Sequence, residues 1–257
     1  MAKIIKTFLF IVTILLVGFY VYKYNRDFQE IEDKRKESQI SESSGVNSVA
    51  TEDKEYAFVW TEIDNLENLY LYPNFQEKYT LEEGIDNYHC KTLSSAGFYS
   101  KDDTPIGLFI SEEEVISNKI NSTLFNGYFI LTKNQKAIIT EEYGDDVARV
   151  GIQAGPLLIK DGRIQDLKDT NDEMARRVIV ALSDKNELFF IAFYTKDSVF
   201  LGPSLRNLPS LIVKAQEEMN TQFVSALNLD GGSASAFYNQ DIILSELTPI
   251  GSFFCEK

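Results

Sequence analysis

The chain has 257 residues, of which 44% are hydrophobic and 12% aromatic, enough to bury the core of one large domain or two small ones. Acidic residues outnumber basic residues by 39 to 25, which gives a formal net charge of -14. Because phosphate backbones are bound by basic surfaces, this balance argues against a nucleic-acid partner.

The first predicted element is an N-terminal membrane helix. Residues 7–22 read TFLFIVTILLVGFYVY without a charge, and lysines flank the run at Lys3, Lys6 and Lys23. The run is slightly shorter than the ~20 residues that a spanning helix prefers, but flanking lysines can extend their ammonium groups to the interface. A cleaved signal peptide is the alternative, yet large aromatic residues stand where a small-residue cleavage site is expected. We therefore predict an uncleaved transmembrane signal anchor over residues 1–23.

The next stretch is predicted to be a flexible stalk. Residues 24–55 are charged and Ser-rich, and they include the run DFQEIEDKRKESQISESSG at 27–45. This composition cannot bury enough apolar surface to hold a fold. The compact domain is therefore predicted to cover residues 56–257.

Beyond residue 55, short apolar runs alternate with turn signals, which is typical of strands. The runs cover residues 57–60, 69–72, 106–110, 127–131, 178–182 and 188–194. They predict that strands dominate this part of the chain.

Two helices are predicted, over Leu81–Tyr88 and Leu208–Met219. One face of the second helix carries Leu211, Ile212, Ala215 and Met219, and Pro209 fits its first turn. Strands with a few helices and no regular β-α alternation favour an α+β fold, with a mixed, largely antiparallel β-sheet core after the N-terminal membrane helix.

The two cysteines, Cys90 and Cys255, lie near opposite ends of the domain, each within a predicted strand. An extracytoplasmic compartment would permit a disulfide between them. Two buried free thiols are the alternative, because the sequence gives no distance between the residues.

The residue inventory excludes several kinds of chemistry. His89 is the only histidine, so a multi-histidine metal site is impossible and any Ser-His-Asp or Cys-His arrangement would need this residue. We interpret His89 as a structural or partly exposed residue on a strand. Neither a GxxxxGK[ST] loop nor a GxGxxG motif occurs, so no nucleotide cofactor is indicated. No cofactor is predicted, although a single calcium ion bound by loop oxygens would leave no signature.

The most informative motif is ALNLDGGSAS at residues 226–235. Its apolar start predicts the end of a buried strand, and that strand delivers Asp230 onto Gly231 and Gly232, whose backbones allow close approach of a ligand. The alternative is an ordinary two-residue hairpin turn with a return strand over Ala234–Tyr238.

Three further segments accompany this turn: SSAGFYSKDDTPIGLFIS at 94–111, GIQAGPLLIKDGR at 151–163 and RRVIVA at 176–181. Together with the Asp230 turn, they resemble the phosphodiester glycosidase family in order and spacing, over roughly residues 56–257. The resemblance implies a hydrolase whose domain lies on the extracytoplasmic side of the membrane.

The resemblance also assigns family positions to this chain. The Asn-Ala-Gly-Met/Phe-Phe pattern falls on 95–99, Pro-x-Gly on 105–107, Gln/Ser-Gly-Pro on Gln153, Gly155 and Pro156, the arginine of Arg-Thr-Ala-x-Gly on Arg177, and the Asp-Gly-Gly turn on 230–232. Two positions depart from the family. Ser95 replaces the usual Asn and loses an amide donor, and Ser233 replaces the third glycine of the turn. These departures indicate either a changed substrate or a relative of the family that binds a ligand without catalysing a reaction.

The resemblance makes Asp230 and Arg177 the predicted catalytic residues. Cleavage of a sugar-1-phosphodiester at the sugar carbon requires stabilised positive charge on the sugar and a stabilised phosphodiester leaving group. The planar guanidinium of Arg177 can bind two phosphate oxygens, and Asp230 can position water or stabilise the developing cation. The predicted substrate-binding residues are Ser95, Gly97, Gln153, Gly155, Gly231, Gly232 and Ser235, and no metal ligand is predicted.

Structural alternatives to these roles stay open at this point. Arg177 could form an ion pair with Asp172 or Glu173, and Gln153 could be a buried structural amide. Arg176 is the neighbour of Arg177 on a predicted strand, so its side chain should point to the opposite face of that strand. A second catalytic carboxylate is not assignable, because the candidates Asp102, Asp103, Asp172 and Glu173 are also typical of loop surfaces.

The predicted function is cleavage of the glycosidic carbon–oxygen bond of a sugar-1-phosphodiester in an extracytoplasmic glycan or oligosaccharide. The predicted partners are this sugar-phosphate or glycan substrate and the membrane that holds the N-terminal helix, with no nucleic acid. A non-catalytic glycan-binding or envelope-assembly module of the same fold is the first alternative. The second is a phosphodiesterase that cuts the phosphorus–oxygen bond, a reaction that commonly needs metals.

Overall fold

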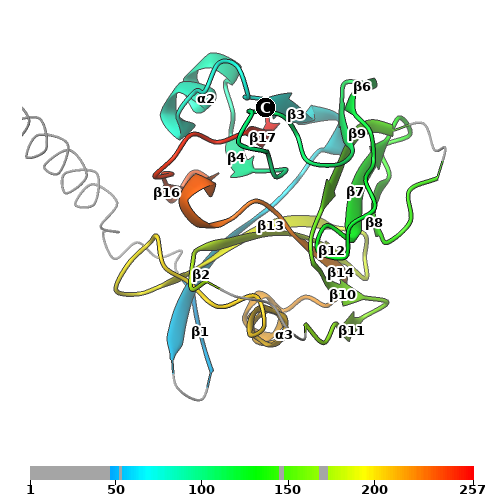
Figure 1. The fold of residues 1–257 in the computed structure, drawn as a ribbon. Helices are drawn as coiled ribbons and strands as arrows, with labels where there is room; N and C mark the ends of the chain where they lie inside the picture. The colour runs from blue at the N-terminus through cyan, green and yellow to red at the C-terminus, as the bar shows by residue number, and fades with distance from the viewer. Residues whose placement is uncertain (1–46, 52–53, 145–147, 168–172) are drawn as a thin grey trace, which may run out of the picture. The chain divides into compact units, whose positions relative to one another are not determined.

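A computed structural model describes residues 47–257 apart from 52–53, 145–147 and 168–172 (Figure 1). The predicted signal anchor over residues 1–23 lies outside the described residues, as does most of the predicted stalk. In the described part of the chain, no helix is both long enough and apolar enough to cross a membrane.

The largest sheet has seven strands, in the order β1-β2-β13-β12-β14-β10-β11. They are β1 (Asn47–Ala50), β2 (Glu55–Glu62), β13 (Leu188–Thr195), β12 (Arg177–Ser183), β14 (Phe223–Asn228), β10 (Leu157–Lys160) and β11 (Arg163–Ile164). The central strands β12 and β13 are buried along nearly their whole length, which explains why their sequences are continuous apolar runs without alternation.

Two five-stranded sheets complete the structure, in the orders β16-β15-β4-β17-β3 and β6-β5-β9-β7-β8. The first contains β16 (Ile243–Leu244), β15 (Phe237–Tyr238), β4 (Thr92–Ser95), β17 (Ser252–Glu256) and β3 (Leu69–Pro73). The second contains β6 (Glu114–Ser117), β5 (Phe109–Ser111), β9 (Ala148–Ala154), β7 (Gly127–Thr132) and β8 (Ala137–Thr140). Every strand pair registered in the described ranges is antiparallel. The predicted α+β class is therefore confirmed as a sheet-rich fold, but these sheets are antiparallel and not mixed.

Both predicted helices form with the predicted bounds, α2 over Leu81–Tyr88 and α3 over Leu208–Met219. Helix α2 begins with a capping box, in which Thr80 and Glu83 bond to each other's backbone N–H. Two short 3-10 helices, η1 (Leu66–Asn68) and η2 (Gly232–Ala234), lie in connections.

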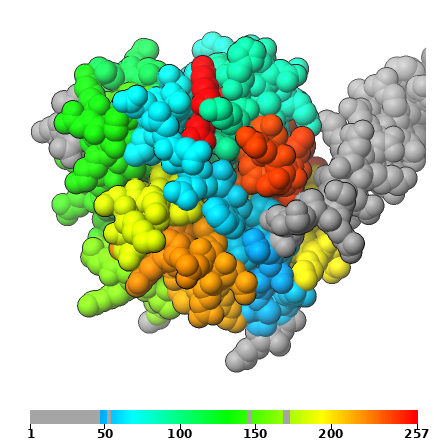
Figure 2. Space-filling model, turned by 180° about the vertical axis from the view of Figure 1, so that it is seen from behind, coloured from blue at the N-terminus to red at the C-terminus, as the bar shows by residue number. Residues whose placement is uncertain are grey.

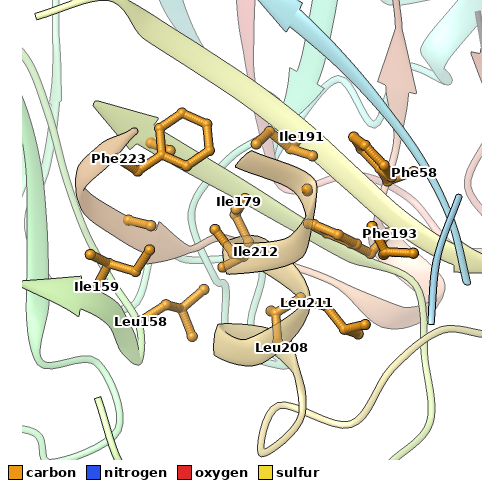
Figure 3. Close-up of a cluster of buried hydrophobic side chains, with 14 of the residues drawn as sticks. Phe58, Leu158, Ile159, Ile179, Ile191, Phe193, Leu208, Leu211, Ile212 and Phe223 are labelled. Carbon is orange, nitrogen blue, oxygen red and sulfur yellow. The ribbon is translucent and has the colours of Figure 1, made fainter. Parts of the chain in front are cut away.

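Helix α3 covers one face of the seven-stranded sheet (Figures 1 and 3). Leu208, Leu211 and Ile212 of this helix are fully buried in one hydrophobic cluster with Ile179 of β12 and Ile191 of β13. On the same helix, Ala215 is buried and Met219 partly buried in that cluster, so the predicted apolar face is the one that packs.

Aromatic side chains link the seven-stranded sheet to the other two sheets. The ring of Phe254 on β17 lies 5.0 Å from Phe190 on β13 and 5.3 Å from Phe129 on β7, measured between centroids. All three side chains are at most 1% exposed. The three sheets therefore share one aromatic junction.

Two predicted boundaries change. Strand β1 (Asn47–Ala50) pairs with β2, which begins at Glu55, so these residues of the predicted stalk belong to the sheet. The strand predicted over 106–110 begins only at Phe109, because Gly107 takes a left-handed φ of 82° and interrupts the extended backbone.

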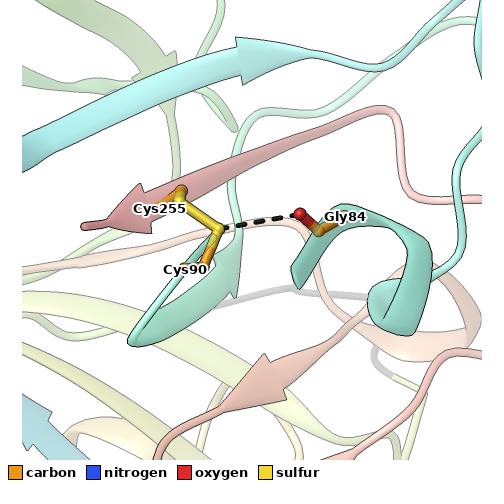
Figure 4. The surroundings of a disulfide bond; sticks show 3 residues. All are labelled: Gly84, Cys90 and Cys255. Atoms are coloured by element: carbon orange, nitrogen blue, oxygen red, sulfur yellow. Dashed lines mark hydrogen bonds between the residues drawn. A yellow bond between two sulfur atoms is a disulfide. The ribbon is translucent and has the colours of Figure 1, made fainter. Parts of the chain in front are cut away.

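A disulfide joins Cys90 to Cys255 (Figure 4). Cys255 lies on β17, as predicted for a strand, but Cys90 lies in the short connection between α2 and β4. His89 is also off the predicted strand, because it ends α2 in a left-handed conformation and is exposed. Seen from behind, the C-terminal end of the chain (red) reaches the surface between the cyan and blue-green segments that contain β3 and α2 (Figure 2). The bridge thus fixes the end of α2 to β17, an inner strand of a five-stranded sheet.

Candidate active site

The Asp230 turn crosses from one sheet to another. Strand β14, which leads into it, belongs to the seven-stranded sheet, whereas β15, which follows it, pairs with β4 and β16 in a different sheet. The alternative of a local hairpin is therefore wrong, because the two strands never pair with each other. Asp230 lies at a junction between sheets, where segments distant in sequence can meet.

Backbone hydrogen bonds bring two of the other family segments to this turn. The Asp230 N–H donates to Ala96 O at 2.8 Å, and the Ser95 hydroxyl donates to Asp230 O at 3.0 Å. Just beyond, the Gly232 N–H donates to Arg176 O at 2.9 Å. The turn is thus held between the end of β4 and the start of β12.

Glycine suits both positions of the turn. Gly232 has a left-handed φ of 66°, which costs any residue with a Cβ. A Cβ on Gly231 would lie 3.0 Å from Arg176 O, closer than ordinary contact, and 3.7 Å from Cδ of Arg177. The side chain of Arg177 therefore passes directly beside the residue that follows Asp230.

Asp230 has an unusual protonation equilibrium. Burial raises the pKa of its carboxyl to about 7, although a hydrogen bond from the Gly231 N–H opposes this rise. The carboxyl is therefore close to half ionised at neutral pH. A group with such a pKa can exchange a proton or hold a charge at physiological pH, as general acid–base catalysis requires.

Tyr99, the last residue of the family pattern at 95–99, is a neighbour of Asp230. Burial raises the pKa of its hydroxyl, and the Asp230 carboxylate raises it further, so Tyr99 stays protonated. Its hydroxyl donates to Pro249 O at 2.7 Å. The segment before Pro249 also bonds the turn, because the Thr248 N–H donates to Ser233 O and the hydroxyls of Thr248 and Ser233 lie 3.1 Å apart.

Arg177 is 9% exposed and interacts with the loops around it. Its Nε donates to Pro203 O at 3.1 Å, and its Nη2 donates to Glu173 O. The side chain of Arg177 therefore holds these loops in place while carrying positive charge beside the Asp230 turn.

Arg176 directly precedes β12, is fully buried and bonds other partners than Arg177 does. Its Nε donates to the Ser235 hydroxyl at 2.7 Å, its Nη2 to Ser245 O at 2.6 Å and to Ser235 O, and its Nη1 to Val199 O at 3.2 Å. Burial lowers the pKa of the guanidinium to about 10, so it remains charged. We did not assign Arg176 to the site from the sequence, where the double arginine was the only signal.

Three predicted substrate-binding side chains lie inside the structure. Ser95 and Ser235 are 0% exposed and Gln153 is 2% exposed. The Ser235 hydroxyl donates to Gly232 O at 2.6 Å, and that of Ser95 bonds Asp230 O. These buried positions give the three side chains internal partners and not the predicted substrate-facing position.

Gln153 is the buried structural amide that the sequence left as an alternative. Its Oε1 accepts from the N–H groups of Ile120 and Leu108, at 2.9 and 3.3 Å. Its amide nitrogen donates to Ile120 O and Phe125 O, each at 2.8 Å. This one amide therefore fixes the loop between β6 and β7.

The remaining predicted glycines are also structural contacts. A Cβ on Gly155 would lie 2.2 Å from Leu124 O, so only glycine fits. Its carbonyl accepts from the Asn228 amide at 2.9 Å, which ties this segment to β14 two residues before Asp230. The Gly97 N–H donates to the Ser252 hydroxyl at 3.0 Å.

The candidates for a second carboxylate separate in the structure. Asp102 is exposed, Asp103 forms an ion pair with Lys78 at 2.6 Å, and Glu173 contributes its carbonyl to Arg177. Asp172 lies outside the described residues. Glu246 is a further partly buried acid that we did not identify from the sequence. Burial raises its pKa, and its carboxylate accepts from the Leu81 N–H at the start of α2. In the ranges that the structure covers, no three His, Cys, Asp or Glu side chains are grouped so that they could bind a metal ion.

The sheet-rich fold brings together a glycine turn that carries the partly buried Asp230 and the family segments that resemble a phosphodiester glycosidase. The family model for phosphodiester glycosidases matches residues 88–252, and the chain belongs to this family. A comparison with curated proteins found no match.

Solved structures share the fold. The catalytic domain of zebrafish N-acetylglucosamine-1-phosphodiester alpha-N-acetylglucosaminidase, auto-inhibited by its pro-peptide, is similar with a TM-score of 0.64 at 15% identity, covering 85% of each chain. A hypothetical protein from Synechocystis has a TM-score of 0.56 at 14% identity, covering 82% of this chain and 61% of the other. A putative exported protein from Burkholderia pseudomallei K96243 has a TM-score of 0.56 at 8% identity, covering 79% and 73%.

Proposed function

We propose that this protein hydrolyses the glycosidic carbon–oxygen bond of a sugar-1-phosphodiester. The observation that carries the proposal is the Asp230 carboxyl, whose pKa burial raises to about 7, on a turn held by two other segments of a phosphodiester glycosidase domain. Membership of the family indicates the class of reaction, and Asp230 is an acid whose pKa suits that reaction.

In this proposal the two charged residues divide the reaction between them. As the bond to the phosphodiester breaks, positive charge develops on the sugar and negative charge on the leaving group. The ionised Asp230 stabilises the sugar cation and positions the attacking water. Arg177 stabilises the leaving phosphodiester. Its position beside Gly231 supports this role.

The buried polar residues act as positioning residues. Ser95 and Arg176 bond the turn on either side of Asp230, and a displacement of a catalytic group by about 1 Å can cost about 100-fold in rate. The serine at position 95 still bonds the turn, although the family usually has an asparagine there. The Ser95 departure is therefore compatible with an intact active site.

A panel of sugar-1-phosphodiesters tests the proposal, with release of free sugar as the readout. We expect turnover by the full chain and a loss of at least about 100-fold in kcat for Asp230→Asn, which keeps the size of the side chain but removes its charge. Asp241→Asn, in an exposed turn, is the matched control and should keep full activity. Absence of turnover across the panel, or equal rates for Asp230→Asn and the wild type, would contradict the proposal.

The position of the cut is tested in oxygen-18 water. Label in the released sugar means carbon–oxygen cleavage, as proposed. Label in the phosphate would mean phosphorus–oxygen cleavage and a phosphodiesterase instead.

We also propose that an N-terminal signal anchor over residues 1–23 holds the domain on the extracytoplasmic side. The Cys90–Cys255 disulfide supports this, because disulfides persist in oxidising compartments. Protease treatment of intact cells should then degrade the domain while a cytoplasmic marker survives. Protection of the domain until the membrane is opened would contradict the proposed side.

A further inference from the structure

Exposed apolar side chains occur on three loops that meet beside the Asp230 turn. Met174, Leu201 and Leu247 are 40%, 51% and 51% exposed, and Phe200, next to Leu201, is partly exposed. We call these four residues the apolar rim. Apolar side chains that gather at the surface commonly mark a binding site for an apolar ligand.

Two of the loops contact the turn itself. The Leu247 N–H donates to Ser233 O at 2.8 Å. On the other loop, Ala175 directly follows Met174, and a Cβ on Gly232 would lie 3.9 Å from the Cβ of Ala175. Met174 and Leu247 therefore lie at or next to contacts with the two residues that follow Gly231.

The third loop, which carries Phe200 and Leu201, is fixed against both arginines. The Arg176 N–H donates to Phe200 O at 3.1 Å, and Arg177 Nε donates to Pro203 O at 3.1 Å. The ring of Phe200 also lies against the Arg176 guanidinium, with 5.5 Å between Cζ and the ring centroid. Leu201 is thus exposed between two contacts with the arginine pair.

The rim lies on the leaving-group side of the proposed reaction. Arg177, which is proposed to stabilise the phosphodiester, donates to Glu173 O, directly before Met174, and to Pro203 O, two residues after Leu201. The loops that hold the guanidinium therefore carry two of the rim residues. The aglycone, which is the group on the far oxygen of the phosphate, would extend from Arg177 along these side chains.

The chemistry of the rim favours a hydrocarbon over a second sugar. Leu and Phe side chains have no hydrogen-bonding group, and the Met thioether is only a weak acceptor. Hydroxyls of a sugar would lose water against such side chains without gaining a partner. Methylene groups gain free energy when they are buried there, and the flexible Met side chain adapts to the shape of a chain.

We propose that the apolar rim binds the hydrocarbon of a lipid alcohol, so that the substrate is a sugar-1-phosphodiester of a membrane lipid. This inference rests on the proposed function and deepens it by naming the class of aglycone. The water oxygen bonds to the anomeric carbon as the bond from that carbon to the phosphate oxygen breaks. The electron pair stays on the phosphate oxygen and a water proton passes to solvent, which leaves free sugar and the lipid monophosphate. The proposed signal anchor supports this substrate, because it would hold the domain at a membrane.

Calorimetric titration of the full chain tests the inference without requiring turnover. The probes are methyl phosphate, butyl phosphate and, as a phosphate on a hydroxyl-bearing group, glucose 6-phosphate. We expect butyl phosphate to bind about tenfold more tightly than methyl phosphate, because burial of two methylenes contributes on this scale. Equal affinity for methyl and butyl phosphate would overturn the inference, as would tighter binding of glucose 6-phosphate than of butyl phosphate.

Variants of the rim test where the chain binds. Leu201→Ser and Leu247→Ser should each reduce the ratio of butyl to methyl phosphate affinity about threefold, whereas Leu201→Met, which keeps an apolar side chain, should preserve it. Ile164→Ser is the matched control, since Ile164 is 53% exposed on the edge strand β11, and it should preserve the ratio. A ratio that both serine variants leave unchanged, or that Ile164→Ser lowers equally, would contradict a site at the rim.

Methyl and butyl diesters of the same sugar 1-phosphates distinguish the two proposals. We expect the wild type to have a KM about tenfold lower for the butyl diester. Turnover that depends on Asp230 but has the same KM for both diesters would retain the hydrolase and reject the rim. Tighter binding of butyl phosphate that the serine variants reduce, without turnover of any diester, would retain the rim and reject the hydrolase.

Discussion

At the scale of single residues, the raised pKa of Asp230 lowers the stability of the fold at neutral pH and suits the residue to catalysis. Burial raises the pKa of its carboxyl from 3.8 to about 7, so the folded state binds this proton more tightly than the unfolded state does. Below the unfolded pKa both states are protonated and nothing is lost. As the pH rises from about 4 to about 7, the unfolded state ionises first, and the folded state loses stability.

The pH dependence of unfolding therefore carries a test. A rise in pKa from 3.8 to about 7 corresponds to at most about 4 kcal/mol of folding free energy lost above pH 7. We expect Asp230→Asn to increase the free energy of unfolding at pH 8, by an amount up to this limit, and to change it little at pH 4, as measured by urea titration. Asp241→Asn should follow the wild type at both pH values. A lower free energy of unfolding for Asp230→Asn than for the wild type at pH 8 would show that interactions in the folded state offset the cost of burying the carboxylate.

The ionisation of Asp230 should also determine how activity depends on pH, and for activity the ionised form is the favourable one. The proposed role of Asp230 requires the ionised form, so kcat/KM should rise with pH and level off above about pH 7. An Asp230 that served as the proton donor would instead give activity that falls through this range.

At the scale of elements, the start of β12 and the turn η2 are held together by one buried guanidinium. Arg176 donates to carbonyls or hydroxyls of Ser235, Ser245 and Val199, three segments that meet only in the folded chain. The partners of Arg176 could not be predicted from the sequence, because they come from distant loops.

Removal of this guanidinium should unfold the junction first. We expect Arg176→Ala to reduce the free energy of unfolding by about 3–5 kcal/mol, because it leaves several buried carbonyls without a donor. Ser235→Ala, which removes one acceptor, should cost less, about 1–3 kcal/mol. Arg163→Ala on the exposed strand β11 is the control, with a change within about 0.5 kcal/mol. An Arg176→Ala variant as stable as this control would show that the junction is held by other contacts.

The elements also show which predictions the sequence supports. Both helices were predicted with correct bounds because helical signals are local, such as the proline in the first turn of α3 and its apolar face. For α2 the structure adds a capping box around Thr80. The Asp-Gly-Gly turn was ambiguous, since a hairpin and a crossing between sheets have the same local pattern. Likewise, the burial of Ser95 and Gln153 depends on tertiary contacts, which composition and spacing do not reveal.

At the scale of the whole molecule, the three sheets meet around Phe254 of β17, which lies between β4 and β3 in its sheet. The next residue, Cys255, forms the disulfide to Cys90. The aromatic junction and the covalent link therefore lie side by side near the C-terminal end of the chain. Pairing of the two cysteines was one of two alternatives in the sequence, because the linear chain gives no distance between them.

This bridge should contribute to the stability of the entire domain. It joins residues separated by 165 positions, and closing so long a loop restricts the unfolded chain strongly, with a typical effect of about 2–5 kcal/mol. We expect the double variant Cys90→Ser, Cys255→Ser to lower the free energy of unfolding by this amount, as measured by urea titration. A reducing agent should lower the stability of the wild type to that of the variant and leave the variant unchanged, and a wild type that is insensitive to reduction under unfolding conditions would mean that the bridge adds no net stability. Because the bridge anchors β17 beside β4, whose last residue Ser95 bonds Asp230, reduction should also lower activity before the domain unfolds.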